Sequence, residues 1–137
     1  MTDNRVNTPN ADRDSNALEE WHRIVTGRDW DALPALLADD VTYHNPAQLE
    51  PLRGKDALVG TLRLVFGIFE DFEYTRRFSG DDGYGLEFRG KVGDAPFTGI
   101  DLVRFDADGK MTDLVVMIRP PDAVIKLGQE ASRRRSG

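Results

Sequence analysis

The chain has 137 residues, a formal net charge of -6 and no cysteine. This length predicts a single domain, and the missing cysteines exclude disulfides, thiolate nucleophiles and zinc–sulfur sites. The acidic balance argues against a nucleic-acid surface, which needs a clustered basic patch. No apolar run approaches the roughly 20 residues of a membrane-spanning helix, and the N-terminus has no signal-peptide core. We therefore expect a cytoplasmic protein without nucleic-acid or membrane partners.

The first half of the chain predicts mainly helices. Residues 1–14 are polar and are expected to form a disordered N-terminal segment. A helix is predicted over residues 16–26, where the apolar residues share one stripe: Leu18, Trp21, Ile24 and Val25. A shorter helix is predicted at about 31–38 and a short strand at 41–45. A third helix begins near Lys55, because apolar residues recur after it at helical spacing.

The second half predicts an antiparallel sheet. Apolar and polar residues alternate in four segments that Gly/Asp-rich turns separate: 72–78, 84–92, 97–105 and 111–119. A last short helix is predicted at about 122–129, covering an opening, and residues 130–137 are expected to be a disordered basic tail. Helices and strands are segregated along the chain. This order predicts an α+β domain over residues 15–129 and excludes a βαβ repeat.

One carboxylate lies inside a predicted strand. Alternation places Asp101 on the same strand face as Phe97, Val103 and Phe105. A carboxylate buried on that face has to be paired, hydrogen-bonded or protonated. Three alternatives remain open: a structural ion pair, an acid or base in a pocket, or an exposed residue at a sheet edge. The candidate arginines for an ion pair are Arg76, Arg89 and Arg119.

Three stretches resemble the nuclear transport factor 2-like superfamily and, within it, the SnoaL-like proteins. They are WDALPALLADDVTYHNP (30–46), LRGKDAL (52–58) and GIDLVRFDADGKMTDLVVMIRP (99–120). The resemblance covers roughly residues 16–125. It implies a cone, in which a curved antiparallel sheet is wrapped by three to four helices around an apolar pocket. It also implies a homodimer paired through the outer sheet face, where the sequence places apolar side chains: Ile100, Leu102, Val115 and Met117.

The resemblance also implies site residues. Ketosteroid isomerase-like and polyketide cyclase-like enzymes of this superfamily use a strand aspartate in an I-D-x-x-R-F setting, and Asp101 stands in that position. Asn45, before Pro46, stands where the isomerases carry the aspartate that transfers the proton, and Trp21 stands where they carry a tyrosine. An amide cannot act as a general base. Classical steroid isomerase activity is therefore not expected.

The first predicted strand carries three further polar or aromatic candidates. Tyr43 and Asn45 share one face by alternation, and His44 points the other way unless the strand end is irregular. An inward His44 would form a proton-transfer pair with Asp101. Otherwise it is a surface or hydrogen-bonded histidine. Two histidines without H-x-x-x-H spacing, and no P-loop or G-x-G-x-x-G motif, predict neither a metal nor a cofactor.

Function is thus predicted at the level of a pocket and its chemistry. In the leading interpretation the pocket binds a small, mostly apolar carbonyl or polycyclic compound. Asp101, with His44 as a second candidate, runs cofactor-independent chemistry of isomerase, cyclase, dehydratase or hydrolase type. In the alternative the domain is a non-catalytic module for ligand binding, dimerisation or protein scaffolding. The predicted ligand contacts are Trp21, Tyr43, Asn45, Phe66, Phe69, Val103 and Val116.

Overall fold

The computed structural model describes the backbone of residues 3–136 and the side chains of residues 13–136. Its elements are α1 (Asp3–Gly27), a 3-10 helix η1 (Trp30–Leu36), β1 (Leu37–His44), β2 (Leu52–Arg53), α2 (Lys55–Phe66), β3 (Glu70–Gly80), β4 (Gly83–Val92), β5 (Ala95–Phe105), β6 (Met111–Arg119) and α3 (Pro121–Ser136). The strands form one sheet in the order β2-β1-β6-β5-β4-β3. Of the strand pairs in the described part of the chain, only β1 and β6 run parallel. The α+β class and the four-strand meander are confirmed.

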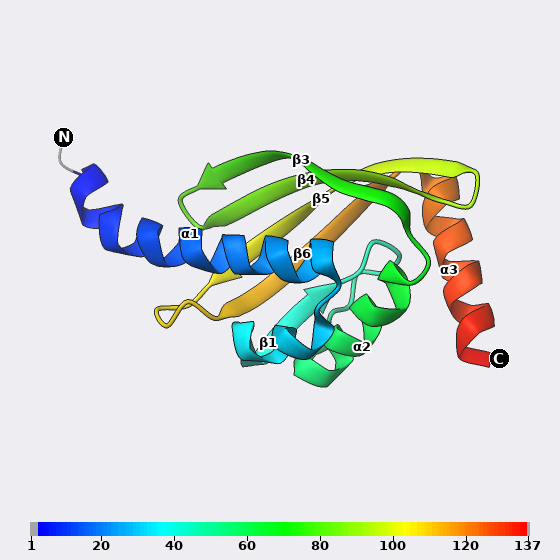
Figure 1. Ribbon diagram of the computed structural model, residues 1–137, viewed down its shortest axis with the longest axis horizontal. Helices are drawn as coiled ribbons and strands as arrows, with labels where there is room; N and C mark the ends of the chain where they lie inside the picture. The colour runs from blue at the N-terminus through cyan, green and yellow to red at the C-terminus, as the bar shows by residue number, and fades with distance from the viewer. Residues whose placement is uncertain (1–2, 137) are drawn as a thin grey trace.

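The helices cover one face of a curved sheet (Figure 1). α1 crosses that face with its predicted apolar stripe buried, and α2 buries a second stripe made of Leu58, Leu62 and Phe66. α3 lies at one end of the sheet, where it packs against β4, β5 and β6. The hydrophobic core therefore lies inside a cone whose wall is the sheet and whose open side is covered by helices.

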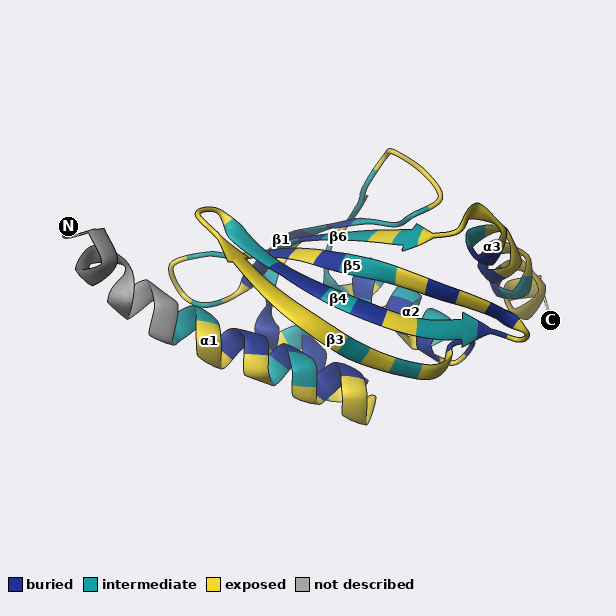
Figure 2. Cartoon of the chain, turned by 90° about the horizontal axis from the view of Figure 1, so that it is seen from above, coloured by how far each residue is buried: buried dark blue, intermediate teal, exposed yellow. Residues whose placement is uncertain are grey.

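Burial alternates along the central strands, whereas β3 is mostly exposed (Figure 2). Leu86 and Phe88 of β4 point into the cone and lie opposite Asp101 and Gly99 of β5. Gly99 is required there, because a Cβ atom would lie 2.3 Å from the Met117 carbonyl oxygen and 2.6 Å from the Phe88 ring. The missing side chain lets the Phe88 ring pack over β5 beside Asp101.

A bulge in β3 changes which residues point inward. Tyr74 lies opposite Phe88 and Arg77 opposite Leu86, so the register shifts by one residue between them. Strict alternation over residues 72–78 would put Arg76 on the same face as Tyr74, and the bulge breaks this alternation. Beyond the bulge Arg76 points to the outer face, where its Nε donates to the Glu87 carboxylate at 2.6 Å.

Helix α1 begins well before the predicted start near residue 16. Two long-range contacts hold the residues just before it: Arg13 donates to the Ala107 carbonyl at 3.1 Å, and the Tyr84 hydroxyl donates to the Asp14 carboxylate at 2.7 Å. Local polarity could not reveal these contacts, because their partners lie more than 60 residues away. The expectation of disorder at residues 1–2 lies outside the described residues.

The C-terminal helix also continues further than expected. α3 runs to Ser136, through the residues for which a disordered tail was predicted, and residue 137 lies outside the description. Arg133 and Arg134 pair with Glu130 one turn earlier. Basic side chains in the last turn also interact favourably with the helix dipole.

No helix of the described residues is long and apolar enough to cross a membrane.

The segment after α1 differs from the predicted helix at 31–38. It forms the 3-10 helix η1, and the chain is already extended at Leu37, whose backbone N–H bonds to the Pro34 carbonyl. Leu37 pairs with Met111 of β6, so strand pairing begins four residues earlier than predicted. Leu33 and Leu37 remain buried, as the pattern indicated.

Candidate functional site

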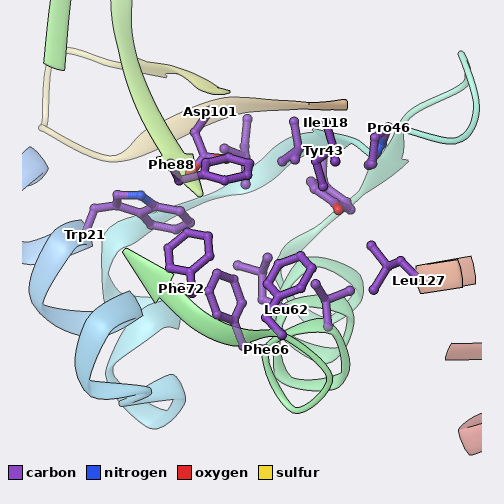
Figure 3. Close-up of a pocket in the computed structure, with 14 residues that line it drawn as sticks. Trp21, Tyr43, Pro46, Leu62, Phe66, Phe72, Phe88, Asp101, Ile118 and Leu127 are labelled. Atoms are coloured by element: carbon purple, nitrogen blue, oxygen red, sulfur yellow. The ribbon is translucent and has the colours of Figure 1, made fainter. Parts of the chain in front are cut away.

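A narrow cavity of about 30 Å³ lies inside the cone (Figure 3). Strand, helix and loop residues all contribute to its wall, and six of the side chains are aromatic: Trp21, Tyr43, Phe66, Phe69, Phe72 and Phe88. The aliphatic part of the wall comes mainly from α2, β6 and α3. A volume of this size is close to that of one water molecule. The interior of the cone is therefore largely filled by side chains.

Asp101 is the only charged residue of the described chain that is buried, with 5% of its surface exposed. It lies on the central strand β5 and lines the cavity. Burial raises the pKa of the carboxyl from 3.8 to about 7, against the smaller opposing effect of a hydrogen bond from Tyr74. At neutral pH both protonation states are thus accessible.

The ion-pair interpretation of Asp101 is wrong. Arg76 pairs with Glu87, Arg89 pairs with Glu73, and Arg119 is exposed at the end of β6. The partner of Asp101 is instead the Tyr74 hydroxyl, which donates to Oδ2 at 2.7 Å. The sheet-edge alternative is also wrong, because β5 has a strand on each side.

Two tyrosines and a tryptophan surround the carboxyl. The Trp21 indole N–H donates to the Tyr74 oxygen at 3.1 Å. Burial, followed by the charge of Asp101, raises the pKa of both Tyr43 and Tyr74 above the usual phenol value. Both phenols therefore keep their protons at neutral pH and can act as hydrogen-bond donors.

The structure brings most of the predicted contacts together. The cavity wall contains Asp101 and five of the predicted ligand-binding residues: Trp21, Tyr43, Phe66, Phe69 and Val116. Val103 is buried close by but does not line the cavity. Asn45 is also absent from the wall, because its side-chain oxygen accepts the backbone N–H groups of Ala47 and Gln48 in a turn.

His44 points away from the cavity, as strict alternation indicates. Its Nε2 lies 3.0 Å from the Asp113 carboxylate, which also accepts a hydrogen bond from the Thr42 hydroxyl. Asp113 belongs to the outer face of β6, where Val115 and Met117 also point. The proposed proton-transfer pair of His44 and Asp101 does not form.

Tyr74, Phe72 and Phe88 were not predicted from the sequence as site residues. A usable signal existed for Tyr74, because alternation placed a hydroxyl on an apolar strand face where it needs a partner. Leu127 was missed as well. It reaches the cavity from α3, which shows that the predicted covering helix contributes to the wall. The described residues contain no group of three or more acidic or histidine side chains that could hold a metal ion.

Comparison with known proteins agrees with this geometry. The family model of the SnoaL-like domain matches residues 18–114. A solved structure of a steroid delta-isomerase from Pseudomonas aeruginosa is 36% identical, with a TM-score of 0.86 over 90% of this chain and 92% of that chain. An uncharacterised bacterial protein with a cystatin-like fold from Silicibacter pomeroyi DSS-3 is 29% identical, with a TM-score of 0.81 over 86% and 84%.

A likeness in fold extends to more distant proteins. An NTF2-like protein of unknown function from Mesorhizobium loti is 19% identical, with a TM-score of 0.69 over 80% of this chain and 93% of that chain. Among curated proteins none matches the sequence. With most of its cone covered by the family match, and with a close structural counterpart over nine tenths of its length, the chain belongs to the SnoaL-like family of the nuclear transport factor 2-like superfamily.

Proposed function

We propose that this protein binds a small, mostly apolar carbonyl or polycyclic compound in its cone and that Asp101 exchanges a proton with it. The observation that supports this function is a buried carboxyl without a cationic partner among the described residues, in a cavity otherwise lined by aromatic and aliphatic side chains. A carboxyl that acts only in contact with solvent would not need a buried position among apolar side chains. Burying a carboxyl is costly, so the fold tolerates it where the proton is used.

The chemistry follows from the two accessible states of the carboxyl. A protonated Asp101 donates to a carbonyl oxygen, and an ionised Asp101 accepts a proton from an adjacent carbon or hydroxyl. Apolar walls strengthen both interactions because they exclude water. The Tyr43 hydroxyl supplies a second donor on the same wall. Isomerisation, cyclisation, dehydration or hydrolysis without a cofactor is consistent with this set of groups.

The similarity to a steroid delta-isomerase supports a polycyclic ligand. It does not support the same assignment of acid and base to separate residues. Asn45 replaces the base expected at that position, and its side chain is engaged in a turn outside the cavity. Asp101 is then the single carboxyl among the described residues of the wall. A reaction that needs one group to give and take back a proton is favoured over one that needs a separate base.

The small volume of the cavity sets a condition on binding. Ligand sites for drug-sized molecules enclose about 300 Å³ or more, and this cavity has only about 30 Å³. A polycyclic ligand therefore enters only if lining side chains, including Leu127 of α3, move apart. We expect binding to be slow and accompanied by a conformational change.

A packed cone also favours a second candidate, a non-catalytic dimerisation module. Three large apolar side chains are exposed on the outer face of the sheet: Phe78 at 47%, Leu102 at 38% and Met117 at 53%. We propose that this surface, called the outer apolar face below, pairs with a second copy of the chain. Dimerisation is compatible with the first candidate and does not require it.

Binding of small ketones distinguishes the two candidates. A panel of mono- and polycyclic ketones is titrated against the wild type, Asp101→Asn and a charge-matched control, Asp81→Asn, in the exposed turn between β3 and β4. We expect saturable binding by the wild type and the control, with a pH midpoint near 7, and weaker, pH-independent binding by Asp101→Asn. Absence of binding by all three proteins would leave the dimerisation module.

A further inference from the structure

A chain of hydrogen bonds crosses the interior of the cone from α1 to the central strand. The Trp21 indole N–H donates to Tyr74 at 3.1 Å, and the Tyr74 hydroxyl donates to Asp101 Oδ2 at 2.7 Å. Trp21 and Asp101 are buried, and each of the three residues comes from a different element. Buried polar groups are expensive unless they are partnered, so this chain is a specific feature and not a chance contact.

The direction of the chain follows from the donor inventory. An indole nitrogen can only donate, so the Tyr74 oxygen accepts from Trp21 and its own proton is directed to Asp101. Oδ2 is then the acceptor in the ionised carboxylate, and it stays the acceptor in the acid whose proton lies on Oδ1. We propose that Tyr74, oriented by Trp21, is a positioning residue that occupies Oδ2 and leaves Oδ1 to carry the proton and to contact the ligand. This inference rests on the proposed function of Asp101.

The arginines that follow Tyr74 in β3 pair elsewhere, so a phenol and not a guanidinium contacts Asp101. The bulge places Arg77 opposite Leu86, and Arg77 pairs with Glu19 of α1. The register shift follows directly after Tyr74 and sends Arg76 to the outer face, where it pairs with Glu87. An arginine beside Asp101 would hold the carboxyl ionised. A neutral donor stabilises the charged form less, so the carboxyl can still take up a proton near neutral pH.

Other titratable groups face the chain from the elements packed against it. The His22 ring of α1 lies 5.5 Å from the Tyr74 ring, between centroids. Tyr43 of β1 lines the same cavity, and its hydroxyl has no hydrogen bond to Asp101 among the described contacts. Further along β3, Arg77 pairs with Glu19 of α1. Among the residues that the structure describes, only Tyr74 donates to Asp101, and Tyr43 therefore offers a matched control.

The test measures the titration of the Asp101 carboxyl carbon by NMR, with Asp101→Asn to assign the signal. Tyr74→Phe keeps the ring and removes the donor, so the ionised form loses its hydrogen bond. We expect roughly tenfold tighter proton binding by Asp101, the scale of one hydrogen bond to a charged group. Tyr43→Phe removes a buried phenol of the same cavity and should leave the midpoint near that of the wild type. His22→Gln checks that the neighbouring imidazole is not the cause.

The outcomes separate the inference from the function on which it rests. A wild-type midpoint near 4 would reject the proposed role of Asp101 whatever Tyr74 does. A wild-type midpoint near 7 that Tyr74→Phe leaves unchanged, or that Tyr43→Phe shifts equally, would overturn the inference alone. If Tyr74→Phe fails to fold, the inference is tested on the wild-type protein through the NMR signal of the Tyr74 hydroxyl proton. A Tyr74 hydroxyl proton that exchanges slowly and shifts with the Asp101 titration supports the chain, and its absence rejects it.

Discussion

The burial of a single residue, Asp101, links the stability of the whole fold to pH. Its pKa is raised from 3.8 to about 7, so between these values the folded protein binds the proton more tightly than the unfolded chain does. The resulting stabilisation is fully present below the unfolded pKa and is lost as the pH rises through about 7. From about pH 5 to about pH 8 we expect the free energy of unfolding to fall by about 3 kcal/mol.

Urea unfolding of the wild type and Asp101→Asn across this pH range measures the effect. The variant lacks the titrating carboxyl, so its stability should change less with pH than that of the wild type. The two proteins share every other titratable group, so the contributions of those groups cancel in the comparison. Parallel curves for the two proteins would contradict a raised pKa at Asp101.

Close packing around Gly99 leaves no room for a side chain on β5. A Cβ atom at this position would lie 2.3 Å from the Met117 carbonyl oxygen and 2.6 Å from the Phe88 ring, which packs beside Asp101 (Figure 3). Gly99→Ala should therefore lower the free energy of unfolding by about 1–3 kcal/mol and displace the ring from the cavity wall. Gly128→Ala in α3 is the control, because a Cβ there meets no atom within 4 Å and alanine favours a helix. Equal stabilities of the two variants would show that β5 tolerates a side chain.

At the scale of an element, α3 closes the open end of the cone. Leu127 reaches the cavity from this helix, while Lys126 pairs with Asp94 and Arg134 donates to the Gly67 carbonyl at 3.0 Å. Leu127→Ala should cost about 2–4 kcal/mol of stability, because it removes buried methyl groups and leaves a larger cavity.

The larger cavity left by Leu127→Ala can also be detected by the binding of a small apolar ligand. Benzene, which fits an apolar cavity of about 150 Å³, should bind Leu127→Ala more tightly than the wild type in a line-broadening or calorimetric titration. Ile125 lies on the same helix and is 59% exposed, so Ile125→Ala should change neither stability nor benzene binding. If Ile125→Ala and Leu127→Ala behave alike, α3 does not control access to the cone.

At the scale of the whole molecule, the outer apolar face is expected to hold two copies together. Each chain has a mass of 15.4 kDa, and light scattering should report about twice this value. Leu102→Glu and Met117→Glu place charges on that face and should yield folded monomers, since an unpaired charge cannot be buried in an interface. Ile125→Glu on α3 should remain dimeric. A monomeric wild type at high concentration would remove the proposed dimer.

Local patterns predicted those elements whose partners lie next to them in sequence. The strands over 84–92 and 111–119 and the helix start at Lys55 agree with the structure, because alternation and helical spacing are properties of short windows. The start of α1 and the end of α3 were missed. Their stabilising partners include Tyr84 and Ala107 for α1 and Gly67 for α3, all distant in sequence.

Local patterns also predicted one part of the candidate site and missed another. Strand alternation and the family resemblance identified Asp101 and Tyr43 in the pocket wall, and alternation alone sent His44 outward. No local pattern could show that a bulge follows Tyr74, or that the partner of Asp101 is a phenol and not an arginine. The ionisation of Asp101 depends on this neutral partner.

The sequence by itself determined the fold class, the superfamily and the strand face on which Asp101 lies. The fold class and the strand face follow from periodicity, and the superfamily follows from the resemblance of short stretches. Both kinds of pattern involve residues that are close together in the sequence. Only the tertiary structure decided the partner of Asp101, the direction of its hydrogen bonds and the narrow volume of the cavity. Those properties depend on register shifts and side-chain packing between strands and helices distant in the chain, where one extra residue turns a side chain to the opposite face.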